Sequence, residues 1–133
     1  MSKWPGKYII GLTGNIATGK SVVRRMLEHL GAYTIDADTL SHRAIAKGAP
    51  GYQPVLDAFG NFLLDGNGEI NRSKLGRLAF SDPEVLQGLE AIVHPLVGQA
   101  VNIMIQRASQ PVIIIEAIKL LEGNLAGQCD TIW

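Results

Sequence analysis

The fold is decided by the stretch Tyr8-Ile-Ile-Gly-Leu-Thr-Gly14-Asn-Ile-Ala-Thr-Gly19-Lys20-Ser21. Its first part, Tyr8 to Leu12, is a short apolar run typical of a buried strand. Gly14 to Ser21 then fits the pattern G-x-x-x-x-G-K-[ST] without a gap. Val22 to Leu30 carries apolar residues at helical spacing, and Gly31 is typical of the residue that follows a helix. This order of strand, glycine loop and helix predicts a loop that binds the phosphates of a nucleotide.

Each residue type in this loop suits phosphate binding. Gly14 and Gly19 let the backbone turn tightly and approach a phosphate without a clashing Cβ. The N–H groups of the loop and the N-terminus of the following helix both attract negative charge. Lys20 is expected to reach the β- and γ-phosphates, and Ser21 is expected to place its hydroxyl on Mg²⁺. The alternative is a glycine-rich turn that opens an ordinary helix.

The composition is that of one modest globular domain. The chain has 133 residues, of which 47% are hydrophobic and 18% charged, and its net charge is zero. A neutral chain gives no reason to expect a nucleic-acid or membrane partner, and we expect a monomer or weak oligomer. The single cysteine, Cys129, excludes an internal disulfide and a cysteine metal site. Met1 to Lys7 lacks a secretory signal and no apolar run approaches about 18 residues, so the expected location is cytoplasmic.

The rest of the chain predicts an α/β protein with a long helical insertion. Ala32 to Ile35 is expected to form a second strand, parallel to the first and paired with it. Further strands are expected at Val112 to Ile115 and at Cys129 to Trp133. Between the second and third strands, the spacing of apolar residues and the capping residues predict helices over Thr39–Lys47, Tyr52–Phe59, Arg72–Phe80 and Pro83–Arg107, with a turn at Asp65–Gly68.

Individual residues mark the ends of these helices. Asn71 reads as the N-cap of the third of them, and Ser81 or Asp82 as the cap of the fourth. Pro95 is expected to kink or split the fourth helix near His94. The predicted division is a discontinuous nucleotide-binding core, residues 1–36 and 110–133, and a helical substrate-binding insertion, residues 37–109.

Two aspartates follow the second strand directly. Asp36 stands at its carboxyl end, which is the edge where open α/β sheets bind their ligands. In phosphoryl transfer, an acidic side chain often orients the attacking hydroxyl and accepts its proton. Asp36 is therefore a candidate catalytic base, with a simple helix cap as the alternative. Asp38 is a candidate N-cap for a helix that begins at Thr39.

Several short blocks follow one another along the chain in a distinctive order. They are Gly11-Leu-Thr-Gly-Asn-Ile-Ala-Thr-Gly-Lys-Ser21, Ile35-Asp-Ala-Asp38 with His42 and Arg43, Phe59-Gly60, Asp65-Gly66 with Ile70 and Arg72, Leu89 with His94-Pro95, and Glu116 ahead of Leu120-Leu-Glu122. The order and spacing of these blocks resemble those of the dephospho-coenzyme A kinase family. The resemblance implies a P-loop nucleoside-triphosphate hydrolase-like fold of three α/β/α layers around a parallel sheet, with a helical lobe that binds coenzyme A. It also implies transfer of the γ-phosphoryl group of ATP to the ribose 3′-hydroxyl of dephospho-CoA, the last step of coenzyme A biosynthesis.

The resemblance also implies roles for individual residues. Asp36 and Lys20 would be catalytic, and Glu116 would stand in the second shell of Mg²⁺. The ATP-binding residues would be Gly14, Ala17, Thr18, Gly19, Lys20, Ser21 and Val22. The residues that line or support the acceptor pocket would be Asp38, Arg43, Arg72 and His94. From spacing alone, His94 reads equally well as a buried histidine and Arg72 as a solvated helix residue.

The sequence departs from the family in two places. Ile118-Lys119 stands where the family usually has proline and leucine, which changes a loop near the acceptor site. Family members run to roughly 200 residues, so the resemblance implies that the lid arginines, the adenine-contacting segment and the last core helix are missing after Trp133. Such arginines are worth on the order of 10³ or more in rate, so the chain itself is expected to be a weak or inactive catalyst. The alternatives are an ATP-binding module without catalysis and another small-molecule kinase of nucleoside or shikimate type.

Overall fold

The computed structural model describes residues 4–13, 20–117, 127 and 129–132. The predicted phosphate-binding residues Gly14, Ala17, Thr18 and Gly19 lie outside this set, as does Ile118-Lys119, the departure from the family expected near the acceptor site. For Lys20 and Ser21 the backbone alone is described. The chain divides into two compact units: unit 1 is Met1–Asp38 with Gly98–Trp133, and unit 2 is Thr39–Val97. The predicted insertion ended at residue 109, whereas the structure divides within the last helix.

Unit 1 is built on a four-stranded parallel sheet. The strands are β1 (Tyr8–Leu12), β2 (Tyr33–Asp36), β3 (Val112–Glu116) and β4 (Thr131–Ile132), in the spatial order β2-β3-β1-β4. The core lies in this sheet, because the side chains of Ile9, Ile35 and Ile113 to Ile115 are fully buried. Burial on both faces explains why β1 and β3 read as nearly continuous apolar runs.

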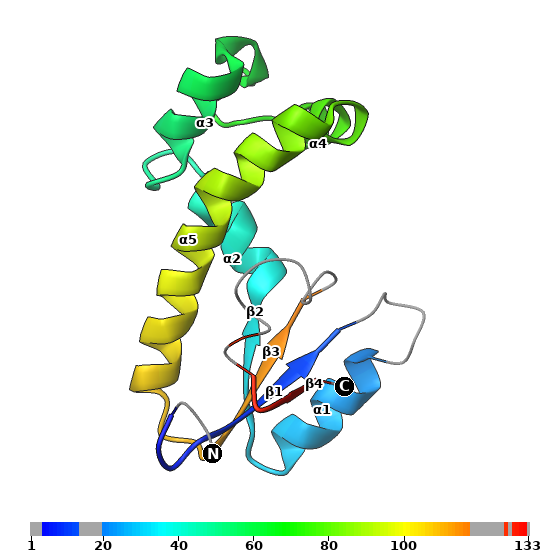
Figure 1. The fold of residues 1–133 in the computed structure, drawn as a ribbon, viewed down its shortest axis with the longest axis vertical. Helices are drawn as coiled ribbons and strands as arrows, with labels where there is room; N and C mark the ends of the chain where they lie inside the picture. Colours follow the sequence, from blue (N-terminus) through cyan, green and yellow to red (C-terminus); the bar gives the residue numbers. More distant parts are fainter. Residues whose placement is uncertain (1–3, 14–19, 118–126, 128, 133) are drawn as a thin grey trace. The chain divides into compact units, whose positions relative to one another are not determined.

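The parallel arrangement of β1 and β2 was predicted correctly, but their direct pairing was not. β3 lies between them and pairs with both strands (Figure 1). The two most apolar strands, β1 and β3, lie side by side inside the sheet, whereas the more polar β2 lies at its edge. A local strand–helix–strand pattern in the sequence does not show whether a strand from further along the chain lies between the two strands.

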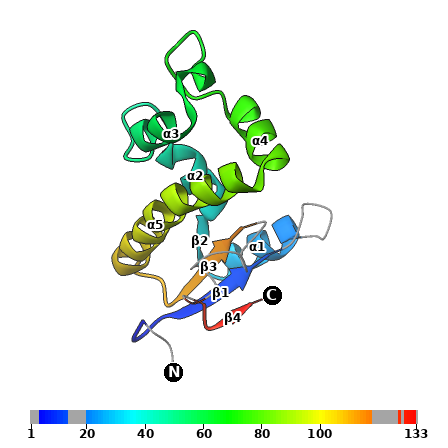
Figure 2. The same ribbon diagram turned by 45° about the horizontal axis from the view of Figure 1, so that its top comes forward.

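Helices flank this sheet on both sides. α1 (Lys20–His29) follows the predicted phosphate loop and ends before Gly31, whose positive φ of 102° confirms it as the residue after the helix. In Figures 1 and 2, α1 and the Gly98–Arg107 part of the last helix lie on opposite sides of the sheet. Unit 1 therefore has the expected three α/β/α layers.

Unit 2 is made mainly of helices. Its elements are α2 (Ala37–Ala44), α3 (Tyr52–Phe59), a single 3₁₀ turn η2 (Asn61–Leu63), α4 (Arg72–Ser81) and α5 (Pro83–Arg107), of which α2 and α5 continue into unit 1. The prediction that Asp38 caps a helix starting at Thr39 is wrong. α2 begins directly after β2, at Ala37, so Asp38 lies in its first turn.

Local capping signals were predicted correctly. Asn71 caps α4, because its side-chain oxygen accepts a hydrogen bond from the Lys74 N–H at 3.0 Å. Asp82 caps α5 in the same way, accepting from the Glu84 N–H at 3.0 Å. The turn after Asp65 is also present, and a single antiparallel bridge between Leu64 and Ile70 flanks it.

α5 remains one continuous helix through Pro95, so the expected split does not occur. Pro95 is exposed, and buried apolar residues of the same helix stand both before and after it in the chain. The buried side chains Val93, Val97, Val101 and Ile105 recur every fourth position. Such a stripe is typical of a helix that packs against a protein core.

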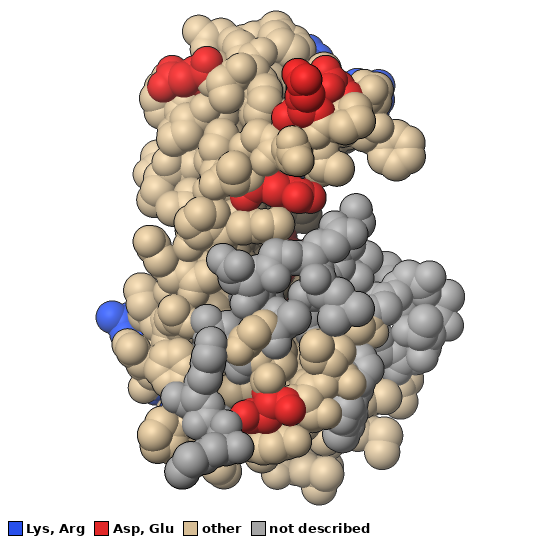
Figure 3. Space-filling view, in the orientation of Figure 1, with Lys and Arg blue, Asp and Glu red and all other residues tan. Residues whose placement is uncertain are grey.

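Among the described residues, α5 is the one helix long and apolar enough to cross a membrane by length and composition. This corrects the expectation that no apolar stretch of that length occurs. Core helices of globular proteins meet the same criterion, and 22% of the apolar window of α5 is buried in the structure. On the face drawn in Figure 3, the described acidic side chains form small separate groups and few Lys or Arg residues are visible, so the described part of this face carries no broad basic surface.

Candidate functional site

The carboxyl edge of the sheet in unit 1 gathers three segments that the sequence had singled out. Glu116, the last residue of β3, is the Cα partner of Leu12 on one side and of Asp36 on the other. Leu12 ends the strand that leads into the predicted phosphate loop. The candidate base and the predicted start of the loop therefore stand at the same level of one sheet, in unit 1.

The two carboxylates at this edge have different surroundings. Asp36 is exposed, whereas Glu116 is buried, with 7% of its surface accessible. A carboxylate is buried at low cost when a cation neutralises it and donates a hydrogen bond to it. Arg24 of α1 does both, with its Nη1 3.1 Å from Glu116 Oε2. Glu116 therefore accepts a hydrogen bond from a protein cation in this structure.

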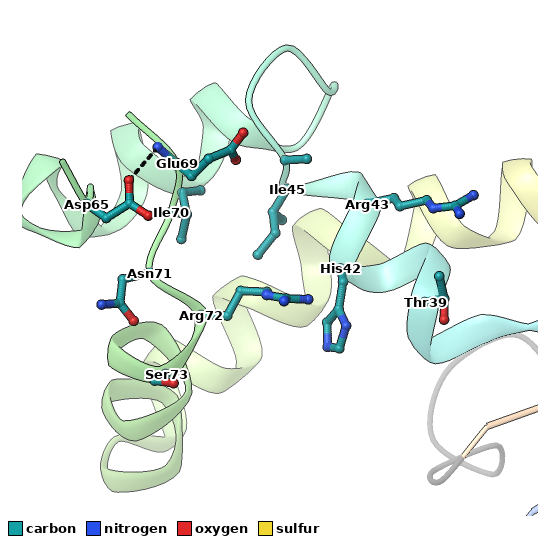
Figure 4. A pocket seen from close by; sticks show the side chains of 11 residues that line it. Thr39, His42, Arg43, Ile45, Asp65, Glu69, Ile70, Asn71, Arg72 and Ser73 are labelled. Carbon is teal, nitrogen blue, oxygen red and sulfur yellow. Dashed lines mark hydrogen bonds between the residues drawn. The ribbon is translucent and has the colours of Figure 1, made fainter. Parts of the chain in front are cut away.

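Unit 2 contains a cavity of about 690 Å³ (Figure 4). Its lining comes from α2, from the turn before α4 and from the start of α4, and it combines cationic, acidic and apolar side chains. The lining residues are Thr39, His42, Arg43, Ile45, Ala46, Asp65, Glu69, Ile70, Asn71, Arg72 and Ser73. Two of the predicted acceptor residues, Arg43 and Arg72, belong to this set. In Figure 4, Arg72 extends toward His42, while Arg43 points the other way along α2.

A second, smaller cavity of about 250 Å³ lies in the same unit. It shares His42, Ile45 and Arg72 with the first cavity, so the two spaces adjoin. Its other lining residues are mostly apolar and come from α2, α4 and α5: Ser41, Leu75, Gly76, Leu89, Glu90, Val93 and His94. The predicted acceptor residue His94 is therefore half-buried beside Arg72 in a cavity that is largely apolar.

The acidic turn next to the larger cavity is held by its own hydrogen bonds. Asp65 Oδ1 accepts from the N–H groups of Asn67 and Glu69, at 2.8 and 3.1 Å. Glu69 in turn accepts from the Lys47 N–H at 2.9 Å through Oε2. These contacts fix the loop that leads into Asn71 and Arg72, and so fix where α4 begins.

Two other predicted residues, Asp38 and Val22, lie outside these cavities. Asp38 lies at the boundary of the two units and is not among the lining residues. Val22, predicted to bind ATP, is exposed on α1, with 60% of its surface accessible. His42 was noted within a motif but received no role, yet it lines both cavities. In the sequence, only its position one residue before Arg43 pointed to His42. Its place in the cavities became clear with the structure, in which α2 and α4 both line them.

Comparison with known proteins extends these observations. A family model described as dephospho-CoA kinase matches residues 8–133, which is nearly the whole chain. The chain belongs to the dephospho-CoA kinase family. A relative named dephospho-CoA kinase from Geobacter metallireducens is 41% identical over 128 residues, covering 94% of this chain and 64% of its own length. The dephospho-CoA kinase of Streptomyces avermitilis is 43% identical over 115 residues, covering 86% of this chain and 56% of its own.

Solved structures agree with this family. The crystal structure of TT1252 from Thermus thermophilus matches with a TM-score of 0.78 and 35% identity, over 94% of this chain and 63% of that one. The dephospho-CoA kinase from Campylobacter jejuni matches with a TM-score of 0.64 and 25% identity, over 81% of this chain and 56% of that one. These matches confirm the P-loop-type fold. The chain spans roughly 55 to 65% of the length of the curated relatives it matches.

Proposed function

We propose that this chain holds the nucleotide-binding and acceptor-binding parts of a dephospho-CoA kinase. Such an enzyme transfers the γ-phosphoryl group of ATP to the ribose 3′-hydroxyl of dephospho-CoA, which gives coenzyme A and ADP. In this proposal unit 1 binds ATP through Gly14, Ala17, Thr18, Gly19, Lys20, Ser21 and Val22, unit 2 binds dephospho-CoA, and the protein works in the cytoplasm.

The observation that carries the proposal is the register of the sheet edge in unit 1. Because Glu116 is paired with both Leu12 and Asp36, the strand end that leads into the phosphate loop and the candidate base belong to one edge. Ligands of open α/β sheets bind at this edge. An exposed carboxylate there suits a base that must reach a bound substrate.

In the proposed reaction, Asp36 orients the 3′-hydroxyl and accepts its proton as the oxygen attacks the γ-phosphorus. Lys20 stabilises the negative charge on the transferring phosphoryl group, and the backbone of the loop holds the remaining phosphates. General-base assistance of this kind contributes about 10²- to 10⁴-fold in rate. Positioning and electrostatic stabilisation supply most of the rest.

Mg²⁺ is proposed as the companion of ATP, because it would neutralise charge on the phosphate oxygens. No group of three or more metal-ligating side chains occurs within the described part of the chain. This fits a nucleotide-bound Mg²⁺, which takes one or two protein ligands and keeps several waters. Ser21 is the proposed direct ligand. Glu116, whose Oε2 accepts from Arg24, fits the outer-shell role that the sequence suggested better than direct ligation.

For the acceptor, we propose that dephospho-CoA binds in the cavities of unit 2. The larger one falls within the range of about 300–1,000 Å³ typical of ligand sites. Arg72 would contact its pyrophosphate, since a guanidinium pairs well with phosphate oxygens, and Arg43, which lines the same cavity, would add positive charge. The smaller cavity, with His94, would take an uncharged part of the substrate, and Asp38 would support the acceptor site.

The proposal is tested by following ADP and coenzyme A with MgATP and dephospho-CoA. Two proteins are compared: the chain itself, and an extended chimera in which the chain is followed by the segment of the Geobacter metallireducens relative that comes after its matched region. The chimera should phosphorylate dephospho-CoA but not nucleosides or shikimate. Phosphorylation of a nucleoside instead would identify another small-molecule kinase. If the chimera binds ATP but transfers phosphate to none of these acceptors, the protein is an ATP-binding module without catalysis.

A further inference from the structure

One wall of the larger cavity in unit 2 is formed by a single stretch of chain, residues 65–73. The lining residues that belong to this stretch are Asp65, Glu69, Ile70, Asn71, Arg72 and Ser73. The other lining residues belong to α2 or follow it directly, and Figure 4 shows the labelled members of the two groups on opposite sides of the cavity. The shape of the cavity therefore depends on how residues 65–73 are held relative to α2.

This stretch is closed on itself by backbone hydrogen bonds. The Asp65 N–H donates to the Glu69 carbonyl oxygen at 2.8 Å, and the Gly68 N–H donates to the Asp65 carbonyl oxygen at 3.2 Å. Gly68 has a φ of 78°, which glycine adopts without strain. The Asn71 N–H donates to the Leu63 carbonyl oxygen at 2.8 Å, just before α4 begins. The turn and the start of α4 are therefore expected to move as one piece.

Two hydrogen bonds tie this turn to the chain that follows α2. The Lys47 N–H donates to Glu69 Oε2 at 2.9 Å. The hydroxyl of Tyr52, the first residue of α3, donates to the Gly68 carbonyl oxygen at 2.5 Å in partly buried surroundings. Tyr52 is not among the described residues that line either cavity. Its hydroxyl can therefore influence a ligand in the larger cavity through the turn, without contacting that ligand.

We propose that Tyr52 is a positioning residue for the acceptor substrate, which holds the turn at Gly68 and thereby sets where Arg72 stands in the cavity. This inference rests on the proposed binding of dephospho-CoA in unit 2. The Arg72 guanidinium has no hydrogen-bond or ion-pair partner among the described residues, so its place depends on the backbone that carries it. Fixing that backbone lowers the ordering cost that ligand binding must offset. The alternative is that the Tyr52 hydroxyl contributes to stability alone.

The experiment titrates dephospho-CoA, and separately ATP, into the chain by calorimetry and compares four variants. These are Tyr52→Phe, Arg72→Ala, the double variant Tyr52→Phe/Arg72→Ala, and Gln53→Met. Tyr52→Phe removes the hydroxyl and keeps the ring. Gln53→Met is the matched control on the same helix, because it removes a hydrogen bond of 2.8 Å from Gln53 to Asp57 Oδ1, and neither residue lines a cavity. Thermal unfolding is recorded for each variant.

Tyr52→Phe should raise Kd for dephospho-CoA roughly fivefold, at the lower end of the coupling between two sites of one protein, and should leave Kd for ATP unchanged. In the Arg72→Ala background, the same substitution should change Kd by less than about twofold, because residues that act through one another are not additive. Gln53→Met should stay within about twofold of the unchanged chain. A purely structural role would lower the unfolding temperature or the number of binding sites without this dependence on Arg72.

Four results would overturn the proposal. An unchanged Kd in a folded Tyr52→Phe variant would show that the hydroxyl does not matter for the acceptor. A loss of the same size in the Arg72→Ala background would show that Tyr52 acts independently of Arg72. An equal loss in Gln53→Met would show a general effect of weakening α3, and a Tyr52→Phe variant that does not fold would assign the hydroxyl to stability. Failure of the unchanged chain to bind dephospho-CoA would instead count against the proposed function itself.

Discussion

Asp36 and Glu116 are directly paired Cα partners at the ends of β2 and β3, yet their surroundings are opposite. Asp36 is exposed, whereas Glu116 is buried and accepts a hydrogen bond from Arg24. Two carboxylates side by side at a ligand-binding edge can therefore serve different purposes. The exposed one is the proposed base for a substrate hydroxyl, and the buried one accepts a hydrogen bond from Arg24.

Replacing Asp36 by asparagine tests the first of these roles. The amide keeps the shape of the side chain but cannot accept a proton, so kcat of the extended chimera should fall about 10²-fold or more. Calorimetry should give an unchanged Kd for ATP. Asp57→Asn, at an exposed aspartate of α3, serves as the control and should leave both quantities unchanged. Loss of ATP binding in Asp36→Asn would show a structural or metal-related role instead.

Arg72→Ala tests the assignment of the cavities in unit 2 to the acceptor. Arg72 lines both of them, so its removal should raise KM for dephospho-CoA about tenfold, as expected for a lost charge-assisted contact. KM for ATP should not change. Arg77→Ala, at an exposed arginine of the same helix, is the matched control. Equal effects of the two substitutions would contradict a specific role for Arg72.

Gly51→Ala tests the close packing of Gly51 against Ala44 and Leu96 in unit 2. A Cβ at position 51 would lie 2.5 Å from the backbone oxygen of Ala44 and 3.2 Å from Leu96 Cδ1. Because a backbone atom cannot move aside easily, the free energy of unfolding should fall by about 2 kcal/mol. Chemical denaturation measures this change. Gly66→Ala is the control, since its Cβ would meet nothing within 4 Å, and a similar loss there would refute the steric explanation.

Asn71→Ala tests the start of α4, which carries Arg72. The substitution removes the oxygen that accepts from the Lys74 N–H, and such caps contribute about 1 kcal/mol. Denaturation should show a loss of that size, together with a modest rise in KM for dephospho-CoA. Asn67→Ala, in the neighbouring turn, should change neither quantity. An unaffected free energy of unfolding in Asn71→Ala would mean that the cap is not formed in solution.

The reactivity of Cys129, which lies just before β4, tests whether its thiol is buried. Burial, with a smaller contribution from Asp130, raises the pKa of the thiol from 9.0 to about 11. The thiolate is the reactive form, so alkylation by iodoacetamide at pH 8 should be about 100-fold slower than for an unperturbed cysteine. The rate should climb toward pH 11 and should reach the ordinary value at pH 8 after denaturation. A fast reaction in the folded protein would contradict this burial.

The sequence allowed the local elements to be predicted well. The bounds of β1 and α3 agree with the predicted ranges, because each is a short apolar segment ended by glycine or a turn. The cap at Asn71 follows from side-chain chemistry within three residues. Predictions of this kind depend on neighbours along the chain.

The errors arose where distant segments decide the outcome. The central place of β3 depends on which strand most needs burial, and α5 continues past Pro95 because its buried stripe outweighs one lost backbone hydrogen bond. The candidate site shows the same division. Asp36 became a candidate from its place after a strand, whereas the pairing of Arg24 with Glu116 and the place of His42 in both cavities depend on how the helices pack.

The central claim, that this chain carries separate binding sites for ATP and for dephospho-CoA, is tested most directly by calorimetric titration of each ligand into the chain, its Lys20→Ala variant and its Arg72→Ala variant. The account predicts that Lys20→Ala weakens ATP binding about tenfold or more and leaves dephospho-CoA binding unchanged, and that Arg72→Ala does the reverse. Loss of both ligands in either folded variant, or an unchanged affinity in both, would contradict it.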